Sequence, residues 1–361
     1  MEMEQNSFLM NQNKTARYEW VDIAKFIGLF LMILGHKELL DTRSTNVIFS
    51  FHMPLFFILS GMLHKDYDFK TALRKVWYSL LRPFLIIAAS WCLIYTQWKL
   101  RHEHDTESVR WLIGHFAGTF ICPGKTFMSY DSICCYIWFL LALALIKLIA
   151  SMVKEKKQWL IAPFVSLAIF IVIYKNSIVL PLAIDSALLA FPFYAIGYGL
   201  NKVLLYKKYN KVLCWTIPIL LFVITITISK QNGIVDINMC RFGNNILYFY
   251  LFGTIGTLAV IGFSKFFVSK PSFITRLGGY LLMVHFLLLD IAHTLQELLG
   301  TRYLVFHIII SVALLLECWL CAFYIFQYSL HRNTFLKFLG RDVCSIYETW
   351  IQIINKLQKI Q

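Results

Sequence analysis

The chain contains ten apolar segments, most of them about as long as a helix that crosses a membrane, and this pattern restricts its fold more than any other feature. A spanning helix needs about 20 apolar residues, because each residue adds about 1.5 Å to its length. The segments are residues 23–39, 47–63, 77–98, 134–153, 159–174, 179–205, 212–229, 246–268, 278–295 and 303–326. The sequence therefore predicts an all-α, polytopic membrane protein with about ten transmembrane helices in one bundle.

The composition excludes two other classes of protein. Hydrophobic residues make up 58% of the chain and charged residues only 15%, whereas soluble domains carry about 25% charged residues. The net charge of +14 would suggest a nucleic-acid partner on a soluble protein. In a membrane protein, however, Lys and Arg collect in cytoplasmic loops. Because no basic domain stands apart from the apolar segments, we expect no nucleic-acid partner.

The distribution of Lys and Arg predicts the orientation in the membrane. If the N-terminus is cytoplasmic, the inside segments carry 21 of these residues and the outside loops carry 10. This bias favours both termini in the cytoplasm and a multi-pass protein of the cell inner (plasma) membrane. We expect a cytoplasmic N-terminal segment at 1–17, a transmembrane domain at 18–330 and a cytoplasmic C-terminal tail at 331–361.

Two ionisable residues on the first apolar segment share a predicted helix face. Lys25 and His36 are 11 residues apart, which returns to within about 20° of the same side and separates them by roughly 16 Å along the axis. Lys25 would face the cytosol, and His36 would lie near the outer end. Each residue also has an ordinary explanation, as a snorkelling lysine and an interfacial histidine.

Other polar residues lie where lipid is expected. On the second segment, His52 is expected at nearly the depth of His36, and two imidazoles at one level suit proton transfer. Arg82 lies inside the third segment, after the basic residues Arg74 and Lys75. Arginine suits phosphate binding in a restricted site, although membrane anchoring explains most of a basic stretch.

The residue types that bind metals do not form a convincing set. A polar loop between the third and fourth segments contains His102, His104, Asp105 and His115. A flexible loop implies no fixed coordination geometry, so we expect no metal. Cys318 and Cys321 lie inside an apolar run, where small buried side chains are the simpler interpretation.

Seven motifs in order carry a resemblance to a known family. They are Lys25 with His36, WVDIAK at 20–25, FHMPLFFILSG at 51–61, the basic stretch of Arg74, Lys75, Arg82 and Pro83, YIWFLLAL at 136–143, FPFYAIGYGL at 191–200 and LGGYLLMVH at 277–285. Over residues 18–330 the chain resembles the acyltransferase-3 family of integral membrane acyltransferases. The resemblance is to the branch with fucose O-acetylase-like and polysaccharide O-acetyltransferase proteins.

The resemblance implies an O-acetyltransferase with ten core helices. Its donor would be cytosolic acyl-CoA, most often acetyl-CoA, and its acceptor a hydroxyl of an extracytoplasmic or lipid-linked sugar, glycolipid or polysaccharide. Lys25, Arg74, Lys75 and Arg82 would bind the nucleotide phosphates through charge-assisted hydrogen bonds. The pantetheine arm would present the thioester near His36.

Two mechanisms and one rival class remain open from the sequence. His36 as general base would contribute about 10²–10⁴-fold, with His52, Tyr136 or Trp138 stabilising the oxyanion and His285 in a supporting role. An acyl-histidine intermediate is the alternative mechanism. A transporter of an acyl group, sugar or lipid intermediate could also use buried ionisable residues. Such proteins often have two halves of similar hydropathy, which this sequence lacks, so we favour the enzyme.

Overall fold

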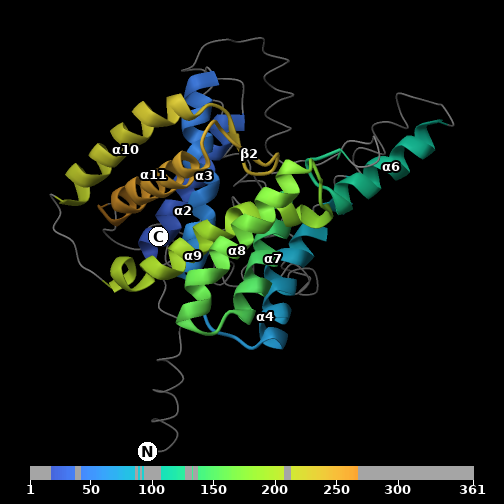
Figure 1. Cartoon of the computed structure of the whole chain (residues 1–361), viewed down its shortest axis with the longest axis horizontal. Helices are drawn as coiled ribbons and strands as arrows, with labels where there is room; N and C mark the ends of the chain where they lie inside the picture. The colour runs from blue at the N-terminus through green and yellow to red at the C-terminus, as the bar shows by residue number, and fades with distance from the viewer. Residues whose placement is uncertain are drawn as a thin grey trace, which may run out of the picture.

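The computed structural model describes residues 18–36, 42–85, 88–89, 92, 107–126, 132, 137–206 and 213–266. Helices account for 82% of these residues, and Figure 1 shows most of them packed around α3. The prediction of a mostly helical fold is confirmed. The expected segments 278–295 and 303–326 lie outside the described residues, so ten helices in one bundle stay a prediction.

Most elements coincide with the apolar segments of the sequence. In chain order they are α2 (Glu19–His36), α3 (Thr42–Met62), α4 (Phe69–Val76), the π-helical turn η1 (Trp77–Leu81), α6 (Glu107–Ile121), α7 (Trp138–Met152), α8 (Lys156–Lys175), the 3₁₀ turn η2 (Pro181–Ala183), α9 (Ile184–Tyr206), α10 (Leu213–Asn232), β1 (Val235–Asp236), β2 (Arg241–Phe242) and α11 (Ile246–Phe266). The predicted segments 23–39, 47–63 and 159–174 match α2, α3 and α8 to within five residues.

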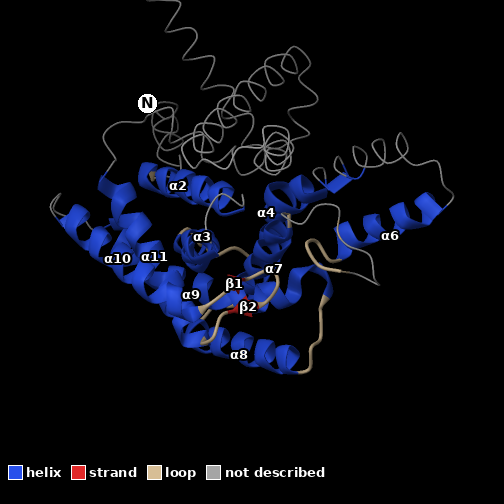
Figure 2. Cartoon of the chain, turned by 90° about the horizontal axis from the view of Figure 1, so that it is seen from above, coloured by secondary structure: helices blue, strands red, loops and turns tan. Residues whose placement is uncertain are grey.

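Helix α3 forms the centre of the described fold. Viewed from above in Figure 2, α3 is seen nearly end-on, with α2, α9, α11 and α7 around it. Every residue from 51 to 59 is buried, as expected for a helix that is apolar on all sides. Phe57 makes an edge-to-face contact with Phe139 of α7 at a centroid distance of 5.1 Å. The FHMPLFFILSG motif therefore lies in the core.

Two glycines allow α3 and α9 to cross at very short range. A Cβ at Gly61 would overlap the backbone carbonyl of Tyr194, and one at Gly197 would overlap the carbonyl of Ile58. Small residues at a helix crossing let the two backbones approach each other. This contact fixes the end of α3 against α9 and thereby positions the turn that leads to α4.

The outer surface of the described helices is that of a membrane protein. Among the described residues, the helical stretches Thr42–Met62, Lys156–Lys175, Pro181–Asn201 and Ile246–Phe266 are long and apolar enough to cross a membrane. Leu160 and Phe164 of α8 are 70% and 68% exposed, and Leu247 of α11 is 72% exposed. Large apolar side chains exposed side by side are unfavourable in water and favourable in lipid.

Two loops contain regular structure that the sequence did not predict. The stretch 99–133 was expected to be a flexible polar loop, but α6 occupies Glu107–Ile121. Residues 233–245 contain a two-stranded antiparallel hairpin, in which Val235 pairs with Phe242 and Asp236 with Arg241. Gly233 and Gly243 flank the strands with φ angles of +80° and +77°, which glycine adopts at low cost.

A proline explains the widened turn at the start of the third segment. Pro83 has no N–H, and its ring would clash with the carbonyl four residues earlier in an α-helix. The backbone N–H of Arg82 instead donates to the carbonyl of Trp77, five residues back, which defines a π-helical turn. Such turns are frequent at functional sites. Compared with an uninterrupted α-helix, the wider turn changes the side of the helix on which Arg82 lies.

The described bundle has two chemically different ends. The turn after α3, the start of α4 and the turn between α7 and α8 lie together at the bottom of Figure 1, and we call this the basic end. The end of α2, η2 and the β1–β2 hairpin lie at the opposite end, which we call the hairpin end. Helices that follow one another in the sequence run antiparallel. Each short turn therefore stays at one end of the bundle, and the next helix carries the chain to the other end.

Candidate active site

Helix α2 links the two ends of the bundle without interruption. It runs from Glu19 to His36 as a regular α-helix, so Lys25 and His36 have Cα atoms roughly 16 Å apart along the axis and within about 20° of one face. The side chain of Lys25 is half-buried. The side chain of His36, the last residue of α2, lies outside the described part of the structure.

The packing of α2 on α3 determines the relative depth of the two histidines. Gly28 of α2 lies against Leu55 of α3 and Gly35 lies against Ile48, so these neighbouring helices run in opposite directions. His36 is one residue nearer to the hairpin end than Gly35, whereas His52 is four residues farther from it than Ile48. His52 therefore lies roughly 7 Å deeper than His36, and not at the nearly equal depth that the sequence suggested.

The hydrogen bond of His52 defines which nitrogen carries its hydrogen. The ring is 3% exposed, and Nδ1 lies 3.0 Å from the carbonyl oxygen of Ile48. A carbonyl can only accept, so Nδ1 is the donor, and Nε2 of the neutral ring carries a lone pair. His52 in this tautomer can accept a proton at Nε2.

The predicted phosphate-binding residues of the third segment lie on one helical run. Arg74 and Lys75 are exposed in the last turn of α4, and the ammonium of Lys75 lies 3.4 Å from the ring centre of Tyr67. The guanidinium of the half-buried Arg82 lies 5.9 Å from the ring centre of Tyr78. Aromatic faces attract cations in this geometry and restrict where these side chains point.

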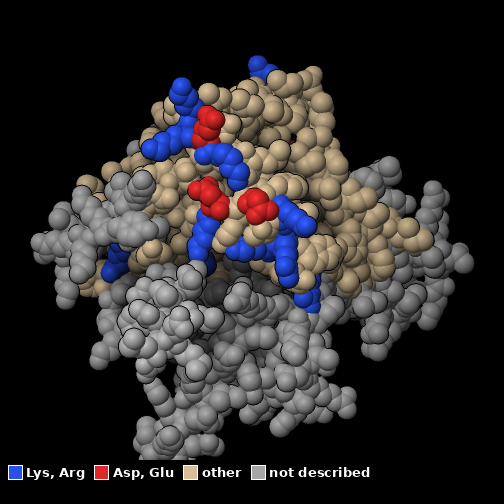
Figure 3. Space-filling model, turned by 90° about the horizontal axis from the view of Figure 1, so that it is seen from below, with Lys and Arg blue, Asp and Glu red and all other residues tan. Residues whose placement is uncertain are grey.

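Basic side chains outnumber acidic ones at the basic end, as Figure 3 shows. The residues there are Lys65, Lys70, Arg74, Lys75, Lys154, Lys156 and Lys157, against Asp66, Asp68 and Glu155. The ammonium of Lys154 donates to the carbonyl of Tyr67 at 2.7 Å, next to the contact that Lys75 makes with the same residue. Such a concentration of positive charge attracts anionic ligands.

The remaining predicted site residues are less completely described. Trp138 begins α7 and is 8% exposed; η2 packs against α7, which places this helix start at the hairpin end. Tyr136 and His285 lie outside the described residues. The structure therefore brings together the cations of α4 and its neighbours, and Trp138 lies at the other end of α7 from the turn that carries Lys154.

His64, just after α3, is a titratable residue that sequence reasoning missed. Its Nδ1 and the hydroxyl of Tyr194 are 2.8 Å apart, and its Nε2 lies 3.3 Å from Oδ1 of Asp66. The rings of Trp159 and Tyr198 enclose it at centroid distances of 5.1 and 5.5 Å. Burial lowers the pKa of His64, and the nearby Asp66 opposes this change. Its position in a polar turn gave no signal in the sequence.

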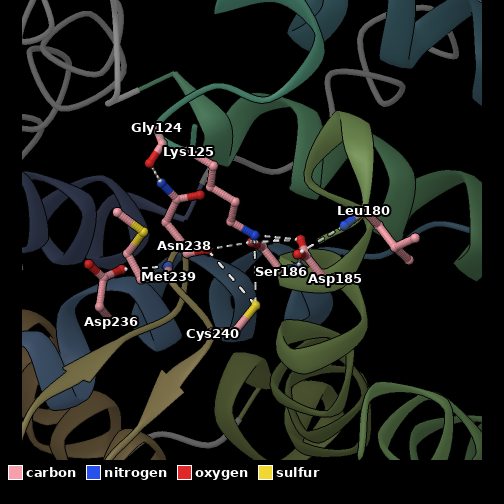
Figure 4. Close-up of polar contacts among 9 residues, drawn as sticks. All are labelled: Gly124, Lys125, Leu180, Asp185, Ser186, Asp236, Asn238, Met239 and Cys240. Atoms are coloured by element: carbon pink, nitrogen blue, oxygen red, sulfur yellow. Dashed lines mark hydrogen bonds and ion pairs between the residues drawn. The ribbon is translucent and has the colours of Figure 1, made fainter. Parts of the chain in front are cut away.

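A buried ion pair at the hairpin end was also missed. Nζ of Lys125 lies 2.7 Å from Oδ1 of Asp185, and the two side chains are 9% and 4% exposed. Figure 4 shows that Ser186 and Cys240 point toward the same ammonium. In the sequence, Asp185 lies in the apolar segment 179–205 and Lys125 lies in the loop before the fourth segment, and their 60-residue separation gives no reason to pair them.

The backbone around this ion pair is strained. Leu182, Ala183 and Cys240 have φ angles of 59°, 57° and 54°, a left-handed conformation that residues other than glycine rarely adopt. Burial raises the pKa of Cys240 to about 11, although Lys125 acts in the opposite direction. The thiol is therefore neutral at physiological pH.

The fold and these groups define a helical membrane protein with one basic end and ionisable residues along its first helices. Within the part of the chain that the structure describes, no group of three or more His, Cys, Asp or Glu residues could hold a metal ion.

A family model described as an acyltransferase domain matches residues 18–359 of this chain. The chain belongs to the acyltransferase-3 family, and membership implies a membrane acyltransferase. No curated protein and no solved structure matches the chain. The domain boundary at 330 and the branch of the family stay predictions.

Proposed function

We propose that the protein transfers an acyl group, acetyl in the first instance, from cytosolic acyl-CoA to a hydroxyl of an extracytoplasmic or lipid-linked sugar, glycolipid or polysaccharide. It would act in the inner (plasma) membrane with both termini cytoplasmic, as a member of the fucose O-acetylase-like and polysaccharide O-acetyltransferase branch. One observation carries the proposal: the unbroken helix α2 bears Lys25 toward the basic end and His36 at the hairpin end. A donor bound at one end could thus react at the other.

The basic end supports the proposed donor site. Coenzyme A carries several phosphate charges, and charge-assisted hydrogen bonds from Arg and Lys are the strong ones. The exposed Arg74 and Lys75 would meet these phosphates first. The half-buried Arg82 and Lys25 would hold the part of the nucleotide that enters the bundle. The extended pantetheine arm would then follow α2 toward His36.

In the proposed reaction His36 acts as general base. It removes the proton of the acceptor hydroxyl while the hydroxyl oxygen bonds to the thioester carbonyl carbon. When the tetrahedral intermediate collapses, the carbon–sulfur bond breaks, and the CoA thiolate takes the proton back from the imidazolium. His285 would have a supporting role in this site.

The contact of His52 Nδ1 with the Ile48 carbonyl favours a proton-accepting role for Nε2 over an oxyanion-stabilising one. Its hydrogen lies on Nδ1 and is donated to Ile48, so neutral Nε2 has no hydrogen to give. The Trp138 indole N–H and the Tyr136 hydroxyl are the donors that we propose for the oxyanion. Preorganised donors of this kind usually contribute the largest part of such catalysis.

The test uses inside-out membrane vesicles given acetyl-CoA with a labelled acetyl group. His36→Ala should lower alkali-labile ester label in extracted glycolipid by about 10²–10⁴-fold, while CoA binding is retained. His115→Ala is the matched control, because it removes a half-buried histidine of α6 that has no role in the proposed reaction. This variant should transfer the acetyl group normally. A normal rate in the His36 variant would remove His36 from the mechanism. Label that enters the vesicle lumen without ester formation would favour the transporter.

A second measurement separates the two mechanisms. An acyl-histidine intermediate requires that labelled CoA exchange into acetyl-CoA in the absence of any acceptor, because the first half-reaction is reversible. Direct transfer with His36 as general base predicts no exchange until an acceptor is present.

A further inference from the structure

The polar cluster at the hairpin end is assembled from three segments that are distant in sequence. Lys125 follows α6, Asp185 and Ser186 lie in the first turn of α9, and Asn238 and Cys240 lie between the two strands. None of these residues belongs to the group proposed for acyl transfer. A buried ion pair adds little stability compared with apolar residues of similar size, so its presence calls for another explanation.

The ammonium of the ion pair already makes three contacts within the cluster. Besides its contact with Asp185, the ammonium of Lys125 donates to Oγ of Ser186 at 3.4 Å and to Sγ of Cys240 at 3.7 Å. The carboxylate of Asp185 also accepts from the backbone N–H of Ser186 at 2.8 Å. All three hydrogens of the ammonium are therefore used. The ammonium therefore has no hydrogen left to offer a ligand, and the pair anchors its surroundings.

The side-chain oxygen of Asn238 differs from the rest of the cluster. Asn238 is 6% exposed, and its Nδ2 donates to the carbonyl of Gly124 at 3.3 Å. This bond fixes the orientation of the amide, because the reverse would set two oxygens against each other. Among the described residues, Oδ1 has no hydrogen-bond partner. Buried acceptors are nearly always paired, since an unpaired one is costly.

The surroundings of Asn238 indicate which chemistry would pair with it. Oδ1 can only accept, so its ligand must donate, as a neutral hydroxyl does and an ionised carboxylate or phosphate does not. Lys125 and Asp185 neutralise each other, which leaves no net charge to attract an anion. The neighbouring Met239 is 47% exposed, so the loop between the strands reaches the surface at the hairpin end.

We propose that Asn238 is a specificity residue for the acceptor, whose Oδ1 accepts a hydrogen bond from one hydroxyl of the sugar. The Lys125–Asp185 pair is a positioning group for Asn238. The hydroxyl of Ser186 lies beside both charged groups and donates to the backbone carbonyl of Asn238 at 3.2 Å. This inference rests on the proposed function and adds a subsite distinct from the reacting hydroxyl. Binding of remote groups of a substrate orients the reacting group.

The test combines variants of the full chain with deoxy analogues of the acceptor. Hexyl glycosides of glucose, galactose and fucose serve as probe acceptors, and the best of them is then used as a series of monodeoxy analogues. Asn238→Leu keeps the size and shape of the side chain and removes the acceptor oxygen. Asn244→Leu is the matched control, because Asn244 is exposed beside the same hairpin and its side-chain amide donates to the carbonyl of Gln231 at 3.2 Å.

One deoxy analogue should raise the acceptor KM of the wild type about tenfold, which is the value of one neutral hydrogen bond. Asn238→Leu should raise the KM of the parent glycoside by a similar factor and leave the donor KM unchanged. The same deoxy analogue should cause no further loss in Asn238→Leu. A purely structural role would not produce this non-additivity.

Three results would overturn the inference. An unchanged acceptor KM in Asn238→Leu, or equal sensitivity of wild type and variant to every deoxy analogue, rejects the assigned subsite alone. A wild type that esterifies none of the glycosides rejects the proposed function together with this inference. If Asn238→Leu does not accumulate as folded protein, Asn238→Ser, a smaller polar change, takes its place in the same comparison.

Discussion

Arg82 directly follows the π-helical turn Trp77–Leu81, on the helical run that leads from the start of α4 at the basic end into the bundle. The sequence placed this arginine inside an apolar segment and suggested phosphate binding. It could not give the widened turn, because the effect of Pro83 depends on which backbone groups the rest of the structure leaves free. Half-burial and the neighbouring Tyr78 restrict the side chain of Arg82, as a binding residue requires.

Arg82→Ala should weaken CoA binding by about 10–100-fold, the usual value of a hydrogen bond between charged groups. Equilibrium binding of labelled CoA to detergent-solubilised protein measures the change. Arg241→Ala, exposed on β2 at the opposite end, removes the same charge and should bind CoA normally. Equal losses in both variants would mean that net charge, and not a contact of Arg82, attracts the donor.

His64 makes stability depend on pH. Burial lowers its pKa in the folded protein, so below the ordinary value of about 6.5 the unfolded chain binds more protons than the folded one. Stability contributed by neutral His64 is therefore complete above this pH and is lost as pH falls through it. The wild type should unfold at a lower temperature at pH 5.5 than at pH 7.5. His64→Gln should show a smaller difference, measured by thermal unfolding in detergent.

Among the elements, α6 and the β1–β2 hairpin show where prediction from apolar segments ends. Both lie in stretches that are too polar or too short to span a membrane, so segment length carried no information about them. Their positions depend on long-range contacts such as the pair between Lys125 and Asp185. The sequence alone shows Lys125 and Asp185 as two separate ionisable residues. A helix such as α8, by contrast, is predicted directly by the length of its apolar segment.

The ion pair predicts unequal effects of single and double changes. Lys125→Met leaves a buried carboxylate without its cation, and Asp185→Asn leaves a buried ammonium; each should lower the free energy of unfolding by about 3–5 kcal/mol. The double variant removes both charges and keeps an oxygen for the Ser186 N–H, so it should recover most of this loss. Chemical denaturation of solubilised protein gives the values. Lys175→Met, on an exposed lysine of α8, is the control, and additive losses in the double variant would argue against coupling.

The described part of the chain is asymmetric: its two ends differ in charge, and its sides expose apolar residues suited to lipid. The basic end carries its charges on the surface, whereas the hairpin end holds Lys125 and Asp185 buried together. The count of Lys and Arg in the loops predicts that the basic end faces the cytosol. The proposed reaction depends on this orientation, because CoA is available on the cytosolic side only.

The two ends of α8 provide a direct test of the orientation. Lys156 begins this helix at the basic end and Asn176 follows it at the hairpin end, and both are exposed. In a chain whose nine native cysteines are replaced, Lys156→Cys should react with a membrane-impermeant maleimide only in inside-out vesicles. Asn176→Cys should react only in right-side-out vesicles. The reverse pattern would place the basic end outside and separate the cations of α4 from cytosolic CoA, and labelling of both positions from one side would mean that α8 does not cross the membrane.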